Sequence, residues 1–452
     1  MDIKDRRIQE LERENAELKA QIAILMARIE ELERRLALNS SNSSKPPSSD
    51  GLRKKSKNRS LRETESKKFG GQIGHKGDTL KQIDNPDIII EYAPEKCSAC
   101  GDLLKDISTA YVVERQEVDI VVEKCVTAHK SSVKLCRCGK KNTGIFPKNI
   151  KTPVQYAANV RAMGIYLTNQ FVSKERISDI FRDLFQLPIS DTTLMSFDEE
   201  LAEKLTPFNE AVLDAIKKAD IKHLDETGMR ITKKTQWVHV ISTALLTHYR
   251  IDPKRGSLLN GIIGKMIHDH WKPYFTIKDV IHALCNAHHL RELKALIEID
   301  TELWAQDMYD LLKDASRLSD PPPEKQQAIS DKYDQIVSAG LKYHEELGQF
   351  KPNSRKKRPG HNLLIRFRGF KRETLLFLYD ADVPFTNNLA ERDLRMIKLK
   401  QKISGSFRTE HGAHAFAAIR SFVSTVQKQD KNIFKYISDV FDGTFDLKTL
   451  VA

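Results

Sequence analysis

The first forty residues carry a seven-residue repeat of apolar positions. Two sets of positions recur every seven residues, and only Asn15 among them is polar: Ile8, Asn15, Ile22, Ile29 and Leu36 in the first set, Leu11, Leu18, Leu25 and Leu32 in the second. Isoleucine at most a positions with leucine at d favours a parallel two-stranded coiled coil, and an asparagine at one a position sets its register. We therefore expect a coiled-coil helix over residues 1–38 and a homodimer through residues 8–36. The alternative is an amphipathic helix that packs on its own chain.

The pattern changes after Leu38 to a polar segment with two consecutive prolines, which is typical of a flexible linker. The linker is expected to span residues 39–92. Residues 51–81 hold ten Lys or Arg against three acids, a net charge of +7. Such a run favours electrostatic binding of nucleic acid, and the candidate residues are Arg53, Lys54, Lys55 and Lys57. The alternative is a solvated tether.

Two cysteine pairs, each followed by glycine, predict a structural Zn²⁺ site within a zinc-ribbon-like module over residues 93–148. The four expected ligands are Cys97, Cys100, Cys136 and Cys138. Four thiolates close a tetrahedral shell, and glycine permits a tight turn around the metal. The alternating residues 109–124 between the pairs predict strands. The second pair has one intervening residue instead of two, so Cys125 and His129 are alternative ligands.

Residues 150–215 are patterned as helices and contain a candidate helix-turn-helix. Four apolar residues predict a buried stripe on the first helix: Ile177, Ile180, Phe181 and Leu184. Leu187 and Pro188 would end that helix, and Ser190 or Asp191 would cap the next one. The second helix has few basic residues, so a hairpin that only packs is an equal alternative to a DNA-binding region.

Three acids in residues 216–436 stand where they could share a site for divalent metal ions. Asp225 and Asp269 each follow a short apolar run that predicts a strand, with Asp225 near the exposed end of its strand. Glu391 follows capping candidates in the sequence TNN and belongs to a predicted helix. Two acids on strands and one on a helix suit an RNase H-like α/β core that holds two Mg²⁺ or Mn²⁺ ions. Most acids are nevertheless solvated surface residues.

The 121 residues between Asp269 and Glu391 predict a helical insertion at about 290–380, and residues 437–452 predict a C-terminal helix or tail. Cys285, His288 and His289 lie on one predicted helix there, where packing explains them better than a second zinc site. Basic residues follow Glu391 at helical spacing or in the next turn, and they are candidate phosphate contacts: Arg392, Arg395, Lys398 and Arg408. The alternative for the helical ones is an ion pair with Glu391.

Composition agrees with a multidomain α+β protein that binds a polyanion. The 452 residues contain 74 Lys and Arg against 62 Asp and Glu, a net charge of +12. The charged N-terminus does not resemble a signal peptide, and no apolar run approaches the length of a membrane span. We therefore expect a cytoplasmic protein.

Several sequence blocks carry a resemblance to a known family. HLDETG, HDHWKPY followed by HALCNAHHLRELK, and VPFTNNLAERDLRMIKLKQKISGSFRTEHGA resemble the catalytic blocks of the insertion-sequence-66 family of bacterial DDE transposases, and LALNSSNSSKPPSSDG and GGQIGHKGDTL resemble its leader. The resemblance implies that Asp225, Asp269 and Glu391 are the DDE acids. It also implies a zinc-binding region, a bacterial and nucleoid-associated location, and accessory transposition proteins as partners. It places His288 and Arg291 beside the active site.

The expected activity is therefore metal-dependent cleavage of DNA at the ends of an insertion sequence, followed by strand transfer into target DNA. Two alternatives stay open: a catalytically inactive, dimeric, zinc-containing DNA-binding protein derived from a transposase, and an RNase H-like nuclease of repair or recombination. The nuclease would not require the coiled coil, the cysteine pairs and the basic leader together.

Overall fold

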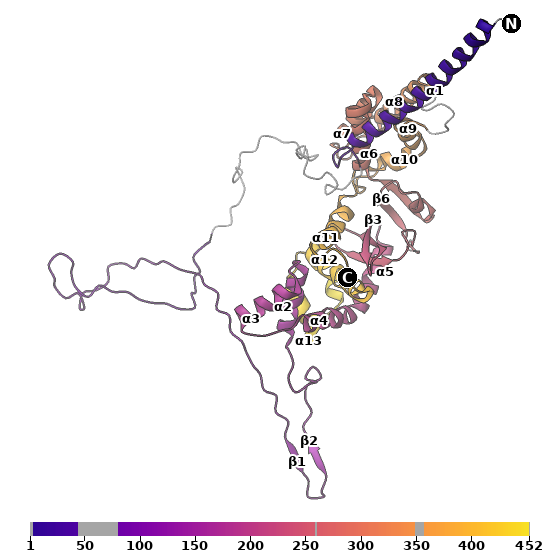
Figure 1. Ribbon diagram of the computed structural model, residues 1–452. Coiled ribbons are helices and arrows are strands. Elements are labelled where there is room, and N and C mark those ends of the chain that lie inside the picture. Colours follow the sequence, from indigo (N-terminus) through magenta and orange to yellow (C-terminus); the bar gives the residue numbers. More distant parts are fainter. Residues whose placement is uncertain (1–2, 44–79, 258–259, 349–356, 452) are drawn as a thin grey trace.

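The computed structural model describes residues 3–43, 80–257, 260–348 and 357–451, and α1 (Ile3–Ala37) projects from one end of it (Figure 1). This helix lies where the heptad repeat predicts one. Near its C-terminal end, Arg34 Nε lies 3.1 Å from Asp300 Oδ2, and Asn42 Nδ2 lies 3.4 Å from Glu298 Oε2. The basic candidates Arg53, Lys54, Lys55 and Lys57 fall outside the described residues.

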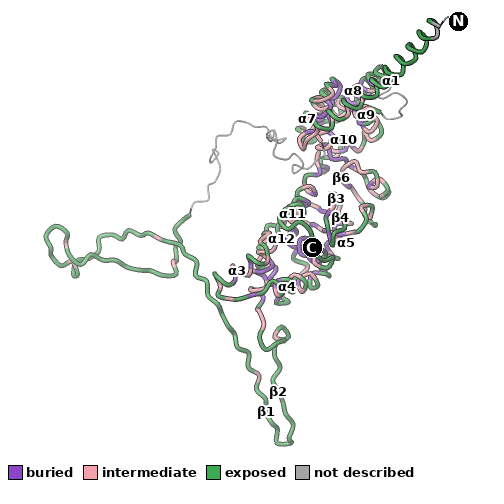
Figure 2. The backbone as a smooth tube through the Cα atoms, in the orientation of Figure 1, coloured by how far each residue is buried: buried purple, intermediate pink, exposed green. Residues whose placement is uncertain are grey.

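Residues 80–150 extend away from the body, and their side chains are largely exposed (Figure 2). The strands assigned here are β1 (Val133–Leu135) and β2 (Lys141–Thr143), which pair antiparallel. The strands predicted over residues 109–124 are wrong for this structure, where that segment has no regular secondary structure. Its apolar residues are exposed, including Tyr111, Val112 and Ile120 at 80–83%. Alternating sequence forms a stable strand only when one face has something to pack against.

The helical region comprises α2 (Ala158–Asn169), α3 (Lys174–Phe185), α4 (Asp191–Lys204) and α5 (Thr206–Lys218). The predicted boundary between two helices is confirmed. Helix α3 ends at Phe185, and the Ser190 hydroxyl accepts a hydrogen bond from Thr193 N at the start of α4. Leu184 was predicted to belong to the buried stripe of α3, but it is 62% exposed, whereas Ile177 is buried as predicted. The apolar face of α4 lies in a core shared with the C-terminal helices α12 (Glu410–Lys428) and α13 (Ile433–Asp442).

A five-stranded mixed sheet forms the centre of the protein. Its strands are β3 (Ile221–Ile231), β4 (Lys234–Ser242), β5 (Thr247–Asp252), β6 (Gly264–His268) and β7 (Val280–Leu284), in the order β5-β4-β3-β6-β7. The pairs β5-β4 and β4-β3 are antiparallel, whereas β3-β6 and β6-β7 are parallel. The protein is therefore a mixed α+β protein, as predicted. The strand β7 was missed because its five residues include a polar His282.

The insertion after β7 is helical, as its sequence predicts, and it has its own apolar core. It comprises α6 (Asn286–Ala295), the π-helix η3 (Leu296–Asp300), α7 (Leu303–Ala315), α8 (Pro323–Glu346), α9 (Pro359–Gly369) and α10 (Lys371–Tyr379). The chain then returns to the sheet through α11 (Asn388–Ser404), and α14 (Lys448–Val451) ends the described chain.

Helices α11 and α12 cover one face of the sheet. Side chains from β3, β4 and β5 pack there against Ala390, Leu394 and Ile397 of α11 and against Ala413 and Ala417 of α12. The N-terminal half of α11 also contacts β5 and α12 through Asp393. Its Oδ2 lies 3.3 Å from Thr247 Oγ1 of β5 and 2.8 Å from Lys428 Nζ of α12. This packing fixes the first turn of α11 relative to the sheet. None of the described helices has both the length and the apolar character that crossing a membrane requires.

Candidate active site

The register of two parallel strands brings Asp225 and Asp269 to the same level of the sheet. His223 pairs with Ile267 in the parallel ladder of β3 and β6, so continuing the register by two residues sets Asp225 against Asp269. Asp269 follows directly after β6, as predicted. Asp225 corrects the prediction, since it lies mid-strand and β3 continues to Ile231. The strand continues because β4 pairs antiparallel with all of its later residues.

Both aspartates are part-buried, and their surroundings disfavour the ionised carboxylate. Burial, followed by the charges of Glu226 and Asp269, holds the pKa of Asp225 well above its ordinary value. Burial and the charge of Glu226 raise the pKa of Asp269 to about 6, although the Trp271 N–H that donates to Asp269 Oδ1 at 2.9 Å opposes this. The Glu391 carboxylate raises both pKa values further. Two aspartates whose ionised forms are disfavoured by burial and by nearby carboxylates form a site suited to a cation.

Glu391 reaches this site because Asn387 anchors the start of α11 to β3. Asn387 Nδ2 donates to the carbonyl oxygen of Leu224 at 2.7 Å, and its Oδ1 lies 2.9 Å from His223 Nδ1. Its backbone N–H also points at Cys285 Sγ, 3.1 Å away. Asn387 was predicted as a capping candidate, but its side chain makes no capping hydrogen bond and instead joins the helix to the sheet.

Glu391 is contacted by two residues of α6 and by Cys285, the residue directly before α6. Its Oε2 lies 3.6 Å from Arg291 Nη2, and its Oε1 lies 3.9 Å from His288 Nδ1 and 3.7 Å from Cys285 Sγ. The expected neighbours His288 and Arg291 are therefore beside Glu391 in this structure. Cys285 differs from the prediction, because it stands at the N-cap position before α6 and not on the helix.

Sequence reasoning missed a buried ion pair on the opposite face of β3. The Glu226 side chain is 1% exposed and accepts hydrogen bonds from Arg255 Nε at 2.9 Å and Nη2 at 2.6 Å, and from the Tyr274 hydroxyl. The Arg255 guanidinium lies between two indole rings, 4.9 Å from the Trp237 centroid and 4.4 Å from that of Trp271. The sequence DET contained a signal for this second acid. Neighbouring residues of a strand point to opposite faces, so Glu226 had to lie on the face opposite to Asp225.

This network connects the two strands that carry the aspartates. Trp271 contacts Arg255 through its ring and Asp269 through its backbone N–H, while Arg255 holds Glu226 beside Asp225. Trp271 stands at the N-cap of the 3₁₀ helix η2 (Lys272–Thr276), and Tyr274 lies within that helix. The segment after Asp269 is thereby held against Glu226 of β3 through Arg255 and through the Tyr274 hydroxyl.

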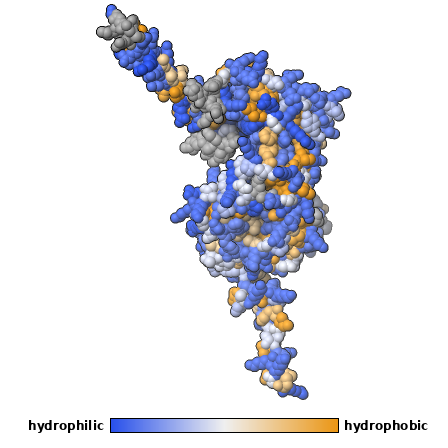
Figure 3. Space-filling view, turned by 90° about the vertical axis from the view of Figure 1, so that its right-hand side faces the viewer, coloured by the Kyte–Doolittle hydropathy of each residue, from blue (hydrophilic) through white to orange (hydrophobic). Residues whose placement is uncertain are grey.

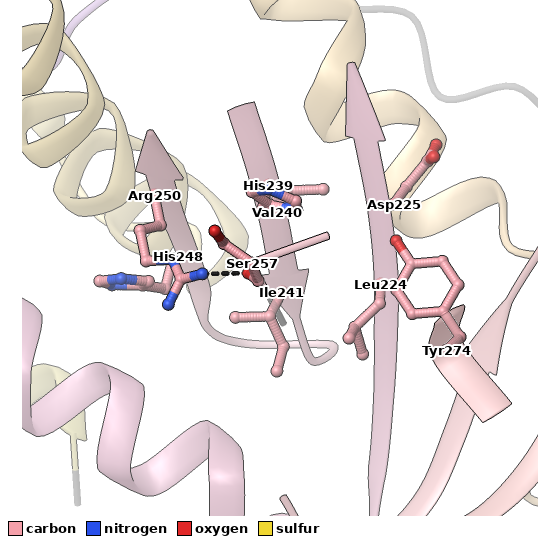
Figure 4. A pocket seen from close by; sticks show the side chains of 9 residues that line it. All are labelled: Leu224, Asp225, His239, Val240, Ile241, His248, Arg250, Ser257 and Tyr274. Carbon is pink, nitrogen blue, oxygen red and sulfur yellow. Dashed lines mark hydrogen bonds between the residues drawn. The ribbon is translucent and has the colours of Figure 1, made fainter. Parts of the chain in front are cut away.

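A cavity of about 20 Å³ lies beside this network, between β3, β4 and β5 (Figure 4). His239, His248, Arg250 and Tyr274 are among its lining residues, and it is large enough for about one water molecule. The carboxylate of Asp225 points away from His248 and Arg250 in this view. Asp225 is also among the lining residues, and the cavity is too small for a nucleotide.

The predicted phosphate contacts lie along or just after α11. Arg392, Arg395 and Lys398 are exposed on the helix, and Arg408 is exposed in the turn before α12. Lys398 Nζ contacts the carbonyl oxygen of Gly228 at 3.3 Å. The ion pairs of Glu391 among the described residues are with His288 and Arg291, so its carboxylate does not pair with these exposed cations of α11.

The cysteine pairs form two separate turns. Gly101 N donates to Cys97 O at 3.0 Å and Gly139 N donates to Cys136 O at 2.8 Å, and both glycines have φ above +80°. The N–H groups of Cys100 and Ala99 lower the pKa of the Cys97 thiol to about 7, and that of Cys138 lowers the pKa of Cys136. Within the described ranges, no three of these sulfur atoms lie within 4.8 Å of one another.

Comparison with known families gives the class of the protein. Residues 154–415, more than half of the chain, match the family described as "Transposase IS66 family", and residues 2–81 match a family of unknown function, DUF6444. No curated protein matches the chain. The first match runs from just before α2 into α12 and includes the sheet and all three acids, so it defines a transposase, an enzyme that acts on DNA. The chain belongs to the IS66 family of transposases.

Proposed function

We propose that Asp225, Asp269 and Glu391 are the catalytic acids of a transposase that cleaves DNA at the ends of its insertion sequence and joins those ends to target DNA. One observation carries the proposal: strand register aligns Asp225 with Asp269, the Asn387 anchor holds the start of the Glu391 helix against β3, and the Glu391 charge raises the pKa values of both aspartates. The sheet order, with three antiparallel strands followed by two parallel ones, supports an RNase H-like core.

The donor set fits Mg²⁺ or Mn²⁺. Hard divalent cations prefer carboxylate oxygens, and a cation between these acids would remove the repulsion that raises the pKa values of the aspartates. Two such ions, when bound, supply activation of the attacking oxygen and stabilisation of the leaving oxygen. Asp225, Asp269 and Glu391 would hold them in their ionised forms.

The remaining residues bind and orient. Arg392, Arg395 and Lys398 are exposed on α11 and Arg408 is exposed in the turn that follows it, and they would contact DNA phosphates. Arg291, already 3.6 Å from Glu391, orients that carboxylate. Arg53, Lys54, Lys55 and Lys57 would add affinity that falls as salt rises.

Zinc and self-association complete the proposal. The turns of Cys97 with Cys100 and of Cys136 with Cys138 would close around one Zn²⁺, which would hold both ends of the extended segment together. The heptad residues of α1 are exposed in a single chain, with Leu18 at 57% and Leu25 at 61%, and a second copy would bury them. Accessory transposition proteins are further candidate partners.

The decisive experiment incubates the full chain with labelled duplex carrying the gene's own flanking ends, with Mg²⁺ or with a chelator. We expect nicking that requires Mg²⁺ and is lost in Glu391→Gln. The matched control is Asp382→Asn, which removes an exposed carboxylate on the loop before α11 and should cut normally. Specific binding without cleavage would instead favour the inactive DNA-binding protein. Cleavage without preference for the element ends would favour a nuclease.

A further inference from the structure

A second group of potential metal ligands shares Glu391 with the proposed catalytic site. The candidate ligand atoms of Cys285, His288 and Glu391 all lie within 4.8 Å of one another, and no other such group of three occurs in the described part of the chain. Two of the separations are 3.7 Å, from Cys285 Sγ to Glu391 Oε1, and 3.9 Å, from His288 Nδ1 to the same oxygen.

These separations are close to those around a tetrahedral metal. Ligand bonds of about 2.0–2.3 Å at tetrahedral angles put neighbouring ligand atoms roughly 3.3–3.8 Å apart. The fold sets the spacing, because Cys285 follows β7, His288 lies in the first turn of α6, and Glu391 lies in the first turn of α11. Only small side-chain shifts would bring all three atoms onto one ion.

The available atoms suit a borderline-soft ion better than Mg²⁺. Sulfur and imidazole nitrogen favour Zn²⁺ and related transition metals, whereas Mg²⁺ favours oxygen. His288 Nδ1 is buried and has no hydrogen-bond partner, so its lone pair is available. Burial raises the pKa of Cys285 to about 12, so metal binding would release the thiol proton to solvent.

We propose that Cys285, His288 and Glu391 form an inhibitory site for Zn²⁺-class ions. An ion held there engages Glu391 Oε1, which the catalytic Mg²⁺ site also needs. Occupancy of one site therefore opposes occupancy of the other. The inhibitory effect rests on the proposed function, whereas the binding of the ion does not.

Binding is tested first, without DNA, on the full chain with Co²⁺ as the probe. Thiolate ligation gives Co²⁺ an intense charge-transfer absorption. We expect Cys285→Ser and His288→Ala each to lose about one equivalent of bound Co²⁺ and the matching absorption, while Cys97→Ser keeps that component. Equal stoichiometry and spectra for wild type, Cys285→Ser and His288→Ala would overturn the site. His288→Ala is included in case Cys285→Ser fails to fold. The His288 side chain is 23% exposed, so its replacement is less disruptive than that of buried Cys285.

Competition is tested next, with Mg²⁺-dependent cleavage as the readout and each variant referred to its own activity without Zn²⁺. The Zn²⁺ concentration that halves activity should rise in proportion to Mg²⁺ in the wild type. It should rise at least about tenfold in His288→Ala, a change of 1.4 kcal/mol in ion binding. His411→Ala, an exposed histidine on α12, is the control and should behave like the wild type.

The two proposals fail in different ways. Co²⁺ binding that depends on Cys285 in a chain that never cleaves DNA would leave the ion site intact and remove the proposed catalysis. Mg²⁺-dependent cleavage whose Zn²⁺ sensitivity is unchanged in His288→Ala would keep the catalysis and overturn the inhibitory site.

Discussion

The C-terminal two thirds of the protein and its N-terminal third use apolar residues differently. From α2 onwards apolar side chains fill four buried clusters, whereas those of α1 and of residues 80–150 are mostly exposed (Figure 2). The projection at the lower end of the space-filling view, which carries β1 and β2, shows apolar residues on its surface (Figure 3). The core is thus complete as a single chain. The N-terminal third has features that a second copy, a metal ion or DNA would complete.

The largest expected effect lies in the core, on catalysis. Asp225→Asn keeps the size of the side chain and removes its charge, so it should lower cleavage by a thousandfold or more, on the order of the several kcal/mol that metal ions contribute. Gel assays of nicking, with DNA affinity measured in parallel, check this. Full cleavage by the variant would remove Asp225 from the site, and unchanged DNA affinity is expected because the basic residues are retained.

The next effect lies in the N-terminal third, on self-association. Leu25→Glu places a charge on the heptad seam and should raise the dimer Kd at least about a hundredfold, since each of two leucines contributes roughly 1.5–3 kcal/mol when buried. Ile24→Glu is the matched control, because Ile24 is 60% exposed, as Leu25 is at 61%, but lies off the seam. Sedimentation measures both. Equal dissociation by the two variants would argue against a coiled-coil dimer.

A smaller effect is expected from the network behind the acids. Glu226→Gln keeps one acceptor for Arg255 but weakens a charge-assisted bond, so the hold on the Asp269 segment should loosen. Cleavage at limiting Mg²⁺ should fall about 10–100-fold, as it does for residues that orient metal ligands, and excess Mg²⁺ should recover part of it. Arg230→Lys, an exposed change on the same strand, should leave the Mg²⁺ dependence unaltered.

The smallest effect is a pH dependence of stability in the absence of metal. The pKa of Asp269 is about 6 in the folded chain and near 3.8 when unperturbed, so the folded state binds more protons between these values. The contribution of Asp269 to stability should therefore fall as pH rises from about 4 to 6, whereas that of His248, whose pKa burial lowers to about 4, should rise over the same range. Asp269→Asn should remove part of this fall and raise the Tm at pH 7 by a few degrees. Thermal melts of the wild type and of Asp269→Asn at pH 4.5 and pH 7 measure it, and a Tm difference between the two proteins that is the same at both pH values would contradict the pKa shift.

The same pKa values make metal binding compete with protons. Mg²⁺ needs the ionised carboxylates, so the stabilisation of the chain by Mg²⁺ should grow as pH rises through about 6. Melts with and without Mg²⁺ at the two pH values separate this effect from the intrinsic one. A Tm increase with Mg²⁺ that is the same at pH 4.5 and at pH 7 would contradict it.

The sequence by itself determined the local features of this protein. The heptad of α1, the cap of Ser190, the acid after β6 and the helical insertion follow from residue spacing, because helices, turns and short strands depend on neighbours a few positions away. The family blocks likewise marked Asp225, Asp269 and Glu391 before any contact was known.

Only the tertiary structure decided which residues meet. The pairing of β3 with β6 sets Asp225 against Asp269, and Asn387 brings Glu391 to them. The Glu226–Arg255 pair and the cluster at Cys285 join segments 29 and 106 residues apart. Residues 109–124 alternate as a strand does but lack a surface to pack against. Such outcomes depend on long-range packing, for which local spacing carries no signal.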